Sequence, residues 1–235
     1  MNVALFATWV LGGVAALDAT PVAQTLLSQP LVTATLLGFL WGDLKLAIEV
    51  GVVLQILAAS TLPVGARTPE DYATGGVAGT GLALALAARQ PFEQVRDSCA
   101  LVGVLAGLVV ALAGVPVLKW QRRRNEGLAH WAEAAVRGGD EGALGTAQGA
   151  AVLLAFGAGV ALTAVGVGAG ARAFHGLTVH ESIRLSRAWE MAHPLWLGLG
   201  LAHLLNAFLQ RWLTRAALFA ASLIAAWLFR MARFS

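Results

Sequence analysis

The sequence predicts an all-α fold, namely a polytopic helical membrane protein with broken or re-entrant helices in a transporter-like layout of two halves. Of its 235 residues, 58% are hydrophobic and only 12% are charged, whereas a soluble protein of this size would need a more charged surface. The apolar runs are continuous and do not alternate with polar residues, which excludes a membrane β-barrel. The 27 glycines indicate close helix contacts and interrupted helices.

The first apolar segment, residues 3–17, is shorter than the roughly 20 residues that cross a bilayer, so we expect a short, tilted or interfacial helix. It has no Lys or Arg ahead of its apolar stretch and is followed by Asp18, so we expect that this segment is retained in the protein and is not a cleaved signal peptide. Asp18, with Thr20 and Pro21, is expected to have a structural role as the N-cap of a following helix.

The long apolar stretch of residues 31–62 is interrupted at Gly42, Asp43 and Lys45. This pattern predicts two helical pieces that meet at a polar break, which lipid tolerates only where protein or a watery cavity surrounds it. An ionisable group at that depth costs on the order of 3 kcal/mol unless it is paired. Lys45 is the nearest candidate partner of Asp43, and a helix-capping role for the Asp43 carboxylate is as plausible as direct contact with a ligand.

Two further polar residues each have two interpretations. Gln55 either hydrogen-bonds a hydroxyl-rich ligand or joins two helices through its amide. Asp71 lies at the end of residues 62–72, where two prolines and a glycine indicate irregular backbone, either a re-entrant tip or a surface turn. Asp71 and Glu70 either pair locally with Arg67, or Asp71 stands at the mouth of a ligand site. A Gly- and Ala-rich helix is expected next, over residues 73–88.

Residues 98–118 form the clearest span, and KWQRRRNE follows directly. Basic residues that flank a span mark the cytoplasmic side, so we expect a cytosolic amphipathic linker helix over residues 119–145. The chain then divides into an N-terminal membrane half, residues 1–118, this linker, and a C-terminal membrane half, residues 146–235. Four tryptophans at the edges of the last apolar elements are expected to anchor at the lipid headgroups: Trp189, Trp196, Trp212 and Trp227.

The sequence lacks the motifs of the common catalytic sites. It has no phosphate-binding P-loop, no H-E-x-x-H and no G-x-S-x-G elbow. Its histidines lack the i, i+4 spacing of a helical metal site, and Cys99 is its single cysteine. We therefore expect no catalytic residue, no metal and no cofactor. The basic residues gather at the ends of apolar runs, where they report topology, so no nucleic-acid partner is expected.

Four ordered motifs in about residues 10–150 are LDATPVAQTLLSQPLV, GFLWGDLKLAIEVGVVLQ, LPVGARTPEDYAT and RRRNEGLAHWAEAAVRGGDEGAL. Together they resemble the membrane component IIC of the mannose/fructose/sorbose family of the sugar phosphotransferase system. The resemblance implies a multi-pass sugar permease subunit of the bacterial cytoplasmic (inner) membrane. It also implies that Asp43, Gln55 and Asp71 lie near the sugar or hold its site, and that this chain forms no phospho-intermediate.

The resemblance implies partners as well: a IID membrane subunit, a soluble IIAB phosphocarrier that phosphorylates a hexose-type sugar, membrane lipid, and a homo-oligomer of IIC–IID units. The sequence departs from the family pattern at Gln29, where a basic residue is usual, at Ala47, where glycine is common, and at Glu70, which separates Pro69 from Asp71. These departures and a shortened second half motivate an alternative, a regulatory or sensory membrane protein that binds phosphotransferase components without transporting sugar. A third and weaker hypothesis is an unrelated polytopic channel.

Overall fold

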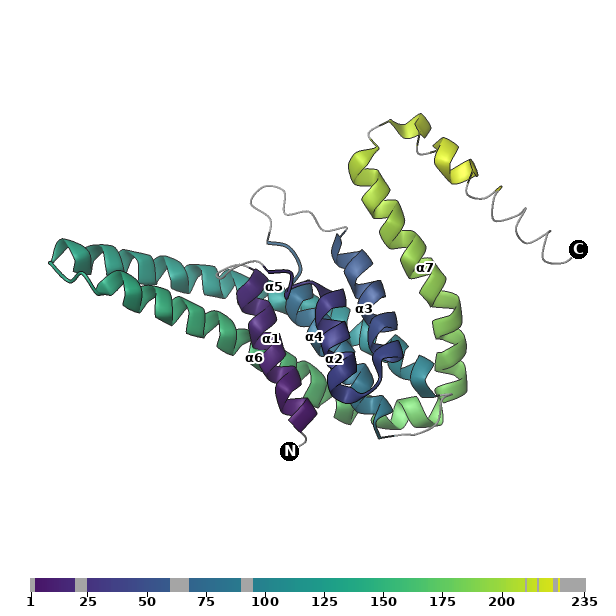
Figure 1. Cartoon of the computed structure of the whole chain (residues 1–235). Helices are drawn as coiled ribbons and strands as arrows, with labels where there is room; N and C mark the ends of the chain where they lie inside the picture. Colours follow the sequence, from purple (N-terminus) through teal and green to yellow (C-terminus); the bar gives the residue numbers. More distant parts are fainter. Residues whose placement is uncertain are drawn as a thin grey trace, which may run out of the picture.

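The computed structural model describes residues 3–19, 25–59, 68–89, 95–209, 211–214, 216–221 and 224, and within these ranges all regular secondary structure is helical. The predicted all-α fold is thereby confirmed. The helices are α1 (Val3–Ala19), α2 (Pro30–Trp41), α3 (Leu44–Ala59), α4 (Tyr72–Ala87), α5 (Arg96–Arg137), α6 (Ala143–His180) and α7 (Ser182–Phe208). The four short helices gather in the body of the molecule, the α5–α6 hairpin extends away from them, and α7 lies on the opposite side (Figure 1).

Helix α4 is the centre of this body, and every residue from Ala73 to Leu86 is buried. Its glycines allow α5 to approach backbone to backbone. A Cβ added at Gly79 would lie 2.5 Å from the carbonyl oxygen of Gly103, and one at Gly75 would lie 2.6 Å from that of Gly107. Each helix thus presents two glycines four residues apart to the other, which is a small-residue packing motif common between membrane helices.

The predicted break at Gly42 and Asp43 is confirmed. Helix α2 ends at Trp41, Gly42 adopts a left-handed conformation with φ of 76°, and α3 begins at Leu44. Only glycine adopts this conformation at little cost, so it is the residue that allows the chain to reverse here. Helices α2 and α3 consequently pack side by side as a hairpin.

Asp43 caps the second arm of this hairpin, because its Oδ1 accepts a hydrogen bond from the Leu46 backbone N–H at 3.2 Å. Its other oxygen, Oδ2, lies 2.7 Å from Nη2 of Arg96, the first residue of α5. The capping interpretation is therefore confirmed, whereas Lys45 as the partner was wrong. Two residues along a helix correspond to a turn of about 200°, so Lys45 leaves α3 in a different direction from Asp43.

Helices α5 and α6, the latter over residues 143–178, are long and apolar enough to cross a membrane. Helix α5 continues without interruption from the apolar segment, through Pro116, into the basic and polar segment that ends at Arg137. Most of the expected linker, residues 119–137, instead continues α5, and a turn in which Gly139 has φ of 95° leads into α6, which begins at Ala143. The predicted boundary at residue 118 lies within α5, and that at residue 145 lies two residues after the start of α6.

The polar stretch of residues 172–190 is helical on both sides of a break at Glu181. Trp189 on α7 is only 5% exposed, and its ring centroid lies 4.9 Å from that of His193 and 5.9 Å from that of Trp196. Its expected role as a headgroup anchor is therefore wrong, since it packs among helices. Trp212 is exposed, and Trp227 lies outside the described residues.

Asp18 is buried in the last turn of α1, where its carboxylate accepts hydrogen bonds from the backbone N–H and hydroxyl of Thr25 and, at 2.8 Å, from the backbone N–H of Ser28. A structural role is thus confirmed, but the carboxylate holds a turn ten residues ahead and does not cap the next helix. Residues 20–24, with Thr20 and Pro21, lie outside the described residues.

Candidate functional site

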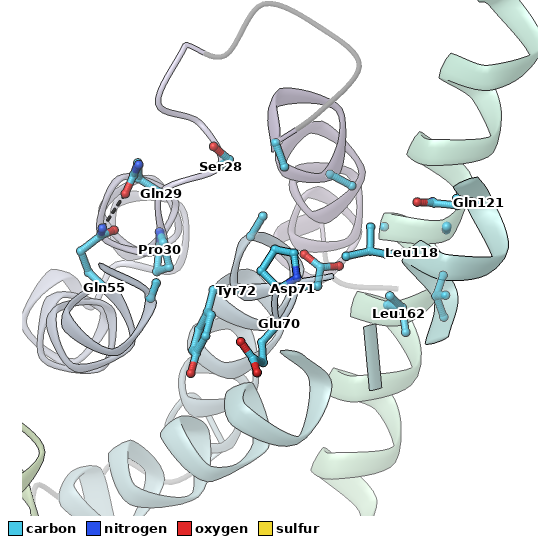
Figure 2. Close-up of a pocket in the computed structure, with 18 of the residues that line it drawn as sticks. Ser28, Gln29, Pro30, Gln55, Glu70, Asp71, Tyr72, Leu118, Gln121 and Leu162 are labelled. Carbon is cyan, nitrogen blue, oxygen red and sulfur yellow. Dashed lines mark hydrogen bonds between the residues drawn. The ribbon is translucent and has the colours of Figure 1, made fainter. Parts of the chain in front are cut away.

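A cavity of about 510 Å³ opens between the start of α2, the end of α3, the start of α4 and the flanks of α1, α5 and α6. Its volume lies in the range of small-molecule sites. Alanine and proline supply much of the apolar wall. The polar side chains that line it are Ser28, Gln29, Gln55, Glu70, Asp71, Tyr72 and Gln121, and Figure 2 shows that they come from several sides of the hollow.

The Gln55 amide joins α3 to the start of α2. Its Oε1 accepts a hydrogen bond from the Leu31 backbone N–H at 3.2 Å, and its Nε2 donates to Oε1 of Gln29. The N–H groups of a first helical turn have no partner within the helix, and Pro30 at the start of α2 leaves the Leu31 N–H among them. The interhelical role proposed for Gln55 is therefore confirmed, and the same amide lines the cavity.

Asp71 is the N-cap of α4. Its carboxylate accepts hydrogen bonds from the Thr74 backbone N–H, at 3.1 Å, and from the Thr74 hydroxyl. The Asp71 backbone N–H donates to the Ala111 carbonyl oxygen of α5 at 3.0 Å. Gly114 makes room for this residue, because a Cβ there would lie 2.4 Å from the Asp71 Cβ. Asp71 is thus held rigidly, only 8% exposed, where α4 begins beside the cavity.

Two of the three predicted site residues, Gln55 and Asp71, line this one cavity, and Asp43 does not. Gln55 lies near the open end of the α2–α3 hairpin, whereas Asp43 lies at its closed end. The twelve residues of α2 span about 18 Å between these ends. Arg67, the predicted local partner of Glu70 and Asp71, lies outside the described residues.

Several polar residues of the cavity were not predicted as site residues: Gln29, Tyr72 and Gln121, together with Ser28. Gln29 has a detectable signal, because a polar side chain directly before a proline-initiated helix lies at the level of unpaired N–H groups. Gln121 has no such signal in the sequence, because it lies within a run of basic residues that indicates membrane topology and not a binding site. Glu70 was considered only for a local ion pair, and it also lines the cavity.

The chemistry of the cavity suits binding more than catalysis. Amides and hydroxyls both donate and accept hydrogen bonds, and carboxylates accept them, so the lining can satisfy a ligand rich in hydroxyl groups. The described part of the chain contains no group of three or more His, Cys, Asp or Glu side chains that could hold a metal ion.

Comparisons with known proteins show which family and which solved structures the chain resembles. The family model described as "PTS system sorbose-specific IIC component" matches residues 2–232. A solved chain titled "Structure of membrane protein" is 18% identical, with a TM-score of 0.69, and the alignment covers 99% of this chain and 95% of that one. This likeness shows a shared fold.

A second solved chain comes from "CryoEM Structure of Mannose Transporter ManYZ and Microcin E492 (MceA) complex". It is 14% identical, with a TM-score of 0.46, and the alignment covers 96% of this chain and 87% of that one. A search of curated proteins finds no match.

Proposed function

We infer the function of this chain from its family, because the chain belongs to the sorbose-specific IIC components of the phosphotransferase system. It is therefore a membrane protein and a subunit of a sugar transporter. We propose that it carries a hexose-type sugar across the bacterial cytoplasmic membrane as a multi-pass permease subunit, and that a soluble IIAB protein phosphorylates the sugar as it arrives.

The cavity is the observation that carries this proposal. Its amide, carboxylate and hydroxyl groups converge on a space of about 510 Å³ whose remaining walls are apolar, mostly alanine and proline together with Val117, Leu118 and Leu162. A sugar presents many hydroxyls, each able to donate and to accept, and a sheltered site must satisfy them or bind weakly. We assign Gln55 and Asp71 as sugar-binding residues, with Gln29, Glu70, Tyr72 and Gln121 as neighbours that complete the site.

Exposed apolar side chains support contacts with lipid and with a second membrane subunit. Leu105, Val109 and Leu112 follow one another at helical spacing along α5 and are exposed in the isolated chain. An exposed apolar stripe on a span faces acyl chains or another helix. We propose that a IID subunit covers part of this surface, and that IIC–IID units assemble into a homo-oligomer.

The proposal is tested by transport. Membrane vesicles containing this chain and a IID subunit of the same family are supplied with phosphorylated IIAB and with radiolabelled mannose, fructose, sorbose or glucose. We expect at least one sugar to accumulate as its phosphate, and only with the phosphoryl donor. If no sugar of the panel accumulates while the IIC–IID pair is present in the vesicles, the permease function is wrong. Binding of IIAB without any uptake would instead favour the regulatory alternative.

A further inference from the structure

A second cavity, of about 710 Å³, lies between the start of α1, the end of α2, the end of α4 and the second half of α6. It shares no lining residue with the cavity that Gln55 and Asp71 line. Helix α4 begins beside that first cavity and ends beside the second, and its sixteen residues span about 24 Å. The two cavities are therefore separate sites at opposite ends of α4.

The polar side chains of the second cavity are all hydrogen-bond donors. Among the described residues that line it, the polar ones are Trp9, Trp41, Arg89 and Arg172. An indole N–H and a guanidinium donate hydrogen bonds and cannot accept them, and no carboxylate, amide or hydroxyl side chain accompanies them in this lining. A sugar hydroxyl both donates and accepts, so the lining suits instead a ligand that supplies acceptors and negative charge.

Several of these donors have no partner in the described part of the chain. The Trp41 indole donates to the Thr8 hydroxyl at 3.0 Å, which fixes this wall of the cavity. The Trp9 Nε1, in contrast, is buried and lacks a hydrogen-bond partner, and no ion pair between described residues involves Arg89 or Arg172. A sheltered N–H without a partner is unfavourable, and two guanidinium groups that line one cavity attract an anion.

The sequence around the two arginines places them at a membrane surface. Arg89 directly follows the apolar helix α4, and Arg172 ends the apolar segment of α6, a helix long enough to cross a membrane. Basic residues and tryptophans at the ends of membrane helices lie at the level of the lipid headgroups. The remaining wall is apolar and includes Leu5, Val165 and Val167. The cavity thus combines positive charge at headgroup level with an apolar surface.

We propose that this second cavity binds an anionic phospholipid, whose phosphate-bearing headgroup lies at Arg89 and Arg172 and whose acyl chain lies along the apolar wall. Guanidinium groups match phosphate oxygens, and basic pockets between membrane helices bind the headgroups of anionic lipids. The choline group of phosphatidylcholine cancels the phosphate charge, so phosphatidylglycerol is expected to bind more tightly. The inference rests on the chain being a membrane protein and does not depend on sugar transport.

The first test compares two double variants with equal loss of charge. The full chain in non-ionic detergent is titrated with dioctanoyl phosphatidylglycerol or dioctanoyl phosphatidylcholine, and bound lipid is measured by native mass spectrometry. We expect R89Q/R172Q to weaken phosphatidylglycerol binding by about tenfold, the loss of a charge-assisted contact. The control R123Q/R187Q removes exposed arginines that do not line the cavity and is expected to leave binding unchanged. Equal losses in both variants, or no preference for phosphatidylglycerol, would overturn the proposal.

A second variant fills the cavity without changing its charge. Gly168 lines the cavity, and a Cβ added there would meet nothing within 4 Å. Gly168→Leu is therefore expected to fold normally and to weaken phosphatidylglycerol binding several-fold. Gly149→Leu, at an equally open position of α6 outside the cavity, is the matched control and is expected to bind like the unmodified chain. If the two leucine variants bind the lipid equally, the lipid lies elsewhere and the proposal is wrong.

A small free anion has the same headgroup chemistry and is distinguished with glycerol 3-phosphate, which lacks acyl chains. We expect it to bind more weakly than dioctanoyl phosphatidylglycerol, because it leaves the apolar wall uncovered. Equal affinities would show a site for a free anion and would overturn the lipid. The outcome is separable from that of the transport experiment, since lipid binding through Arg89 and Arg172 is measured without sugar, IID or IIAB.

Discussion

Gln55 and Asp71 each use part of their hydrogen-bonding capacity to hold a helix start. Gln55 accepts from the Leu31 N–H at the beginning of α2, and Asp71 accepts from the Thr74 N–H at the beginning of α4. These contacts fix the orientation of both side chains before any ligand arrives, which lowers the entropy cost of binding. The two residues are therefore expected to be structural and ligand-binding at once, and the choice of substitution decides which role is tested.

Asp71→Asn separates these roles at one residue. The variant keeps an oxygen for the Thr74 N–H and removes the negative charge, so the fold and membrane insertion are expected to persist. Charge-assisted hydrogen bonds exceed neutral ones by about 1 kcal/mol or more, so we expect sugar affinity to fall by about tenfold. Isothermal titration with the transported sugar measures this.

A matched control for this variant is Asp140→Asn, in the turn before α6. The Asp140 carboxylate also accepts from a backbone N–H, that of Gly142 at 3.0 Å, but it is exposed and does not line the cavity. We expect this control to bind sugar like the unmodified chain. Unchanged affinity in Asp71→Asn would show that the carboxylate does not contact the sugar.

Gln55→Ala removes both the contact to Gln29 and the acceptor of the Leu31 N–H. We expect weaker sugar binding together with a loss of about 1–3 kcal/mol in stability, because a sheltered N–H loses its partner. Thermal unfolding in detergent and sugar titration measure the two effects separately. Gln148→Ala, an amide truncation on the outer part of α6, is the control and is expected to change neither. Full sugar affinity in Gln55→Ala would show that Gln55 does not bind the sugar.

Local chemistry at single residues could be predicted from sequence, but partners distant in sequence could not. The cap at Asp43 and the interhelical amide of Gln55 follow from polar groups in apolar surroundings. Arg96 as the partner of Asp43 does not, because the two residues are 53 positions apart and only the packing of α5 beside the α2–α3 turn brings them together. The nearer Lys45 was therefore the wrong partner.

At the scale of elements, the contact between α4 and α5 depends on the absence of side chains. We predict that Gly79→Ala destabilises the protein by about 1–3 kcal/mol, the usual cost of overpacking, since its Cβ would lie 2.5 Å from the Gly103 carbonyl oxygen. Thermal unfolding in detergent measures the change. Gly149→Ala on α6 is the matched control, because a Cβ there meets nothing within 4 Å.

In that control the substitution is expected to be neutral or to stabilise by about 0.5–1 kcal/mol, through the better helix propensity of alanine. A Gly79→Ala protein as stable as Gly149→Ala would mean that the two helices are less closely packed than described. The sequence indicated close contacts through its glycine content, but it could not pair Gly79 with Gly103, because the register between two helices is a property of the assembled fold.

Element boundaries were the least predictable part of the fold. The break at Gly42 has a local cause, a left-handed glycine, and it was predicted. The continuation of α5 from its apolar segment to Arg137 was not. The change in composition near Lys119 marks a change of solvent around the helix, and a helix crosses such a boundary without any change of its backbone.

At the scale of the whole molecule, the basic segment of α5 predicts that the cavity and the outer hairpin face the cytoplasm. Cys99 is buried and is the single cysteine of the sequence, so Cys99→Ser gives a background for labelling. In that background Gly127→Cys, at an exposed position with no neighbour within 4 Å of its Cβ, is expected to react with a membrane-impermeant maleimide in inside-out vesicles. Reaction in right-side-out vesicles alone would reverse the orientation.

The class of the molecule was predictable because composition reports the surrounding solvent directly. The cavity was only half predictable, because it is a meeting of Ser28, Gln55, Asp71 and Gln121 from four separate parts of the chain. The sequence shows which of these residues are polar within apolar segments, but only the folded arrangement shows which of them line one cavity. Asp43 satisfies the first condition and fails the second.

Pro116 gives the outer hairpin a mechanical property. Proline has no N–H to donate and crowds the preceding turn, so helices bend most easily at such positions. From Pro116 to the end of α5 at Arg137 the helix extends for about 30 Å. A hinge rotation of about 10° at Pro116 would swing the hairpin tip by about 5 Å, so a soluble protein touching the tip would have leverage on the walls of the cavity.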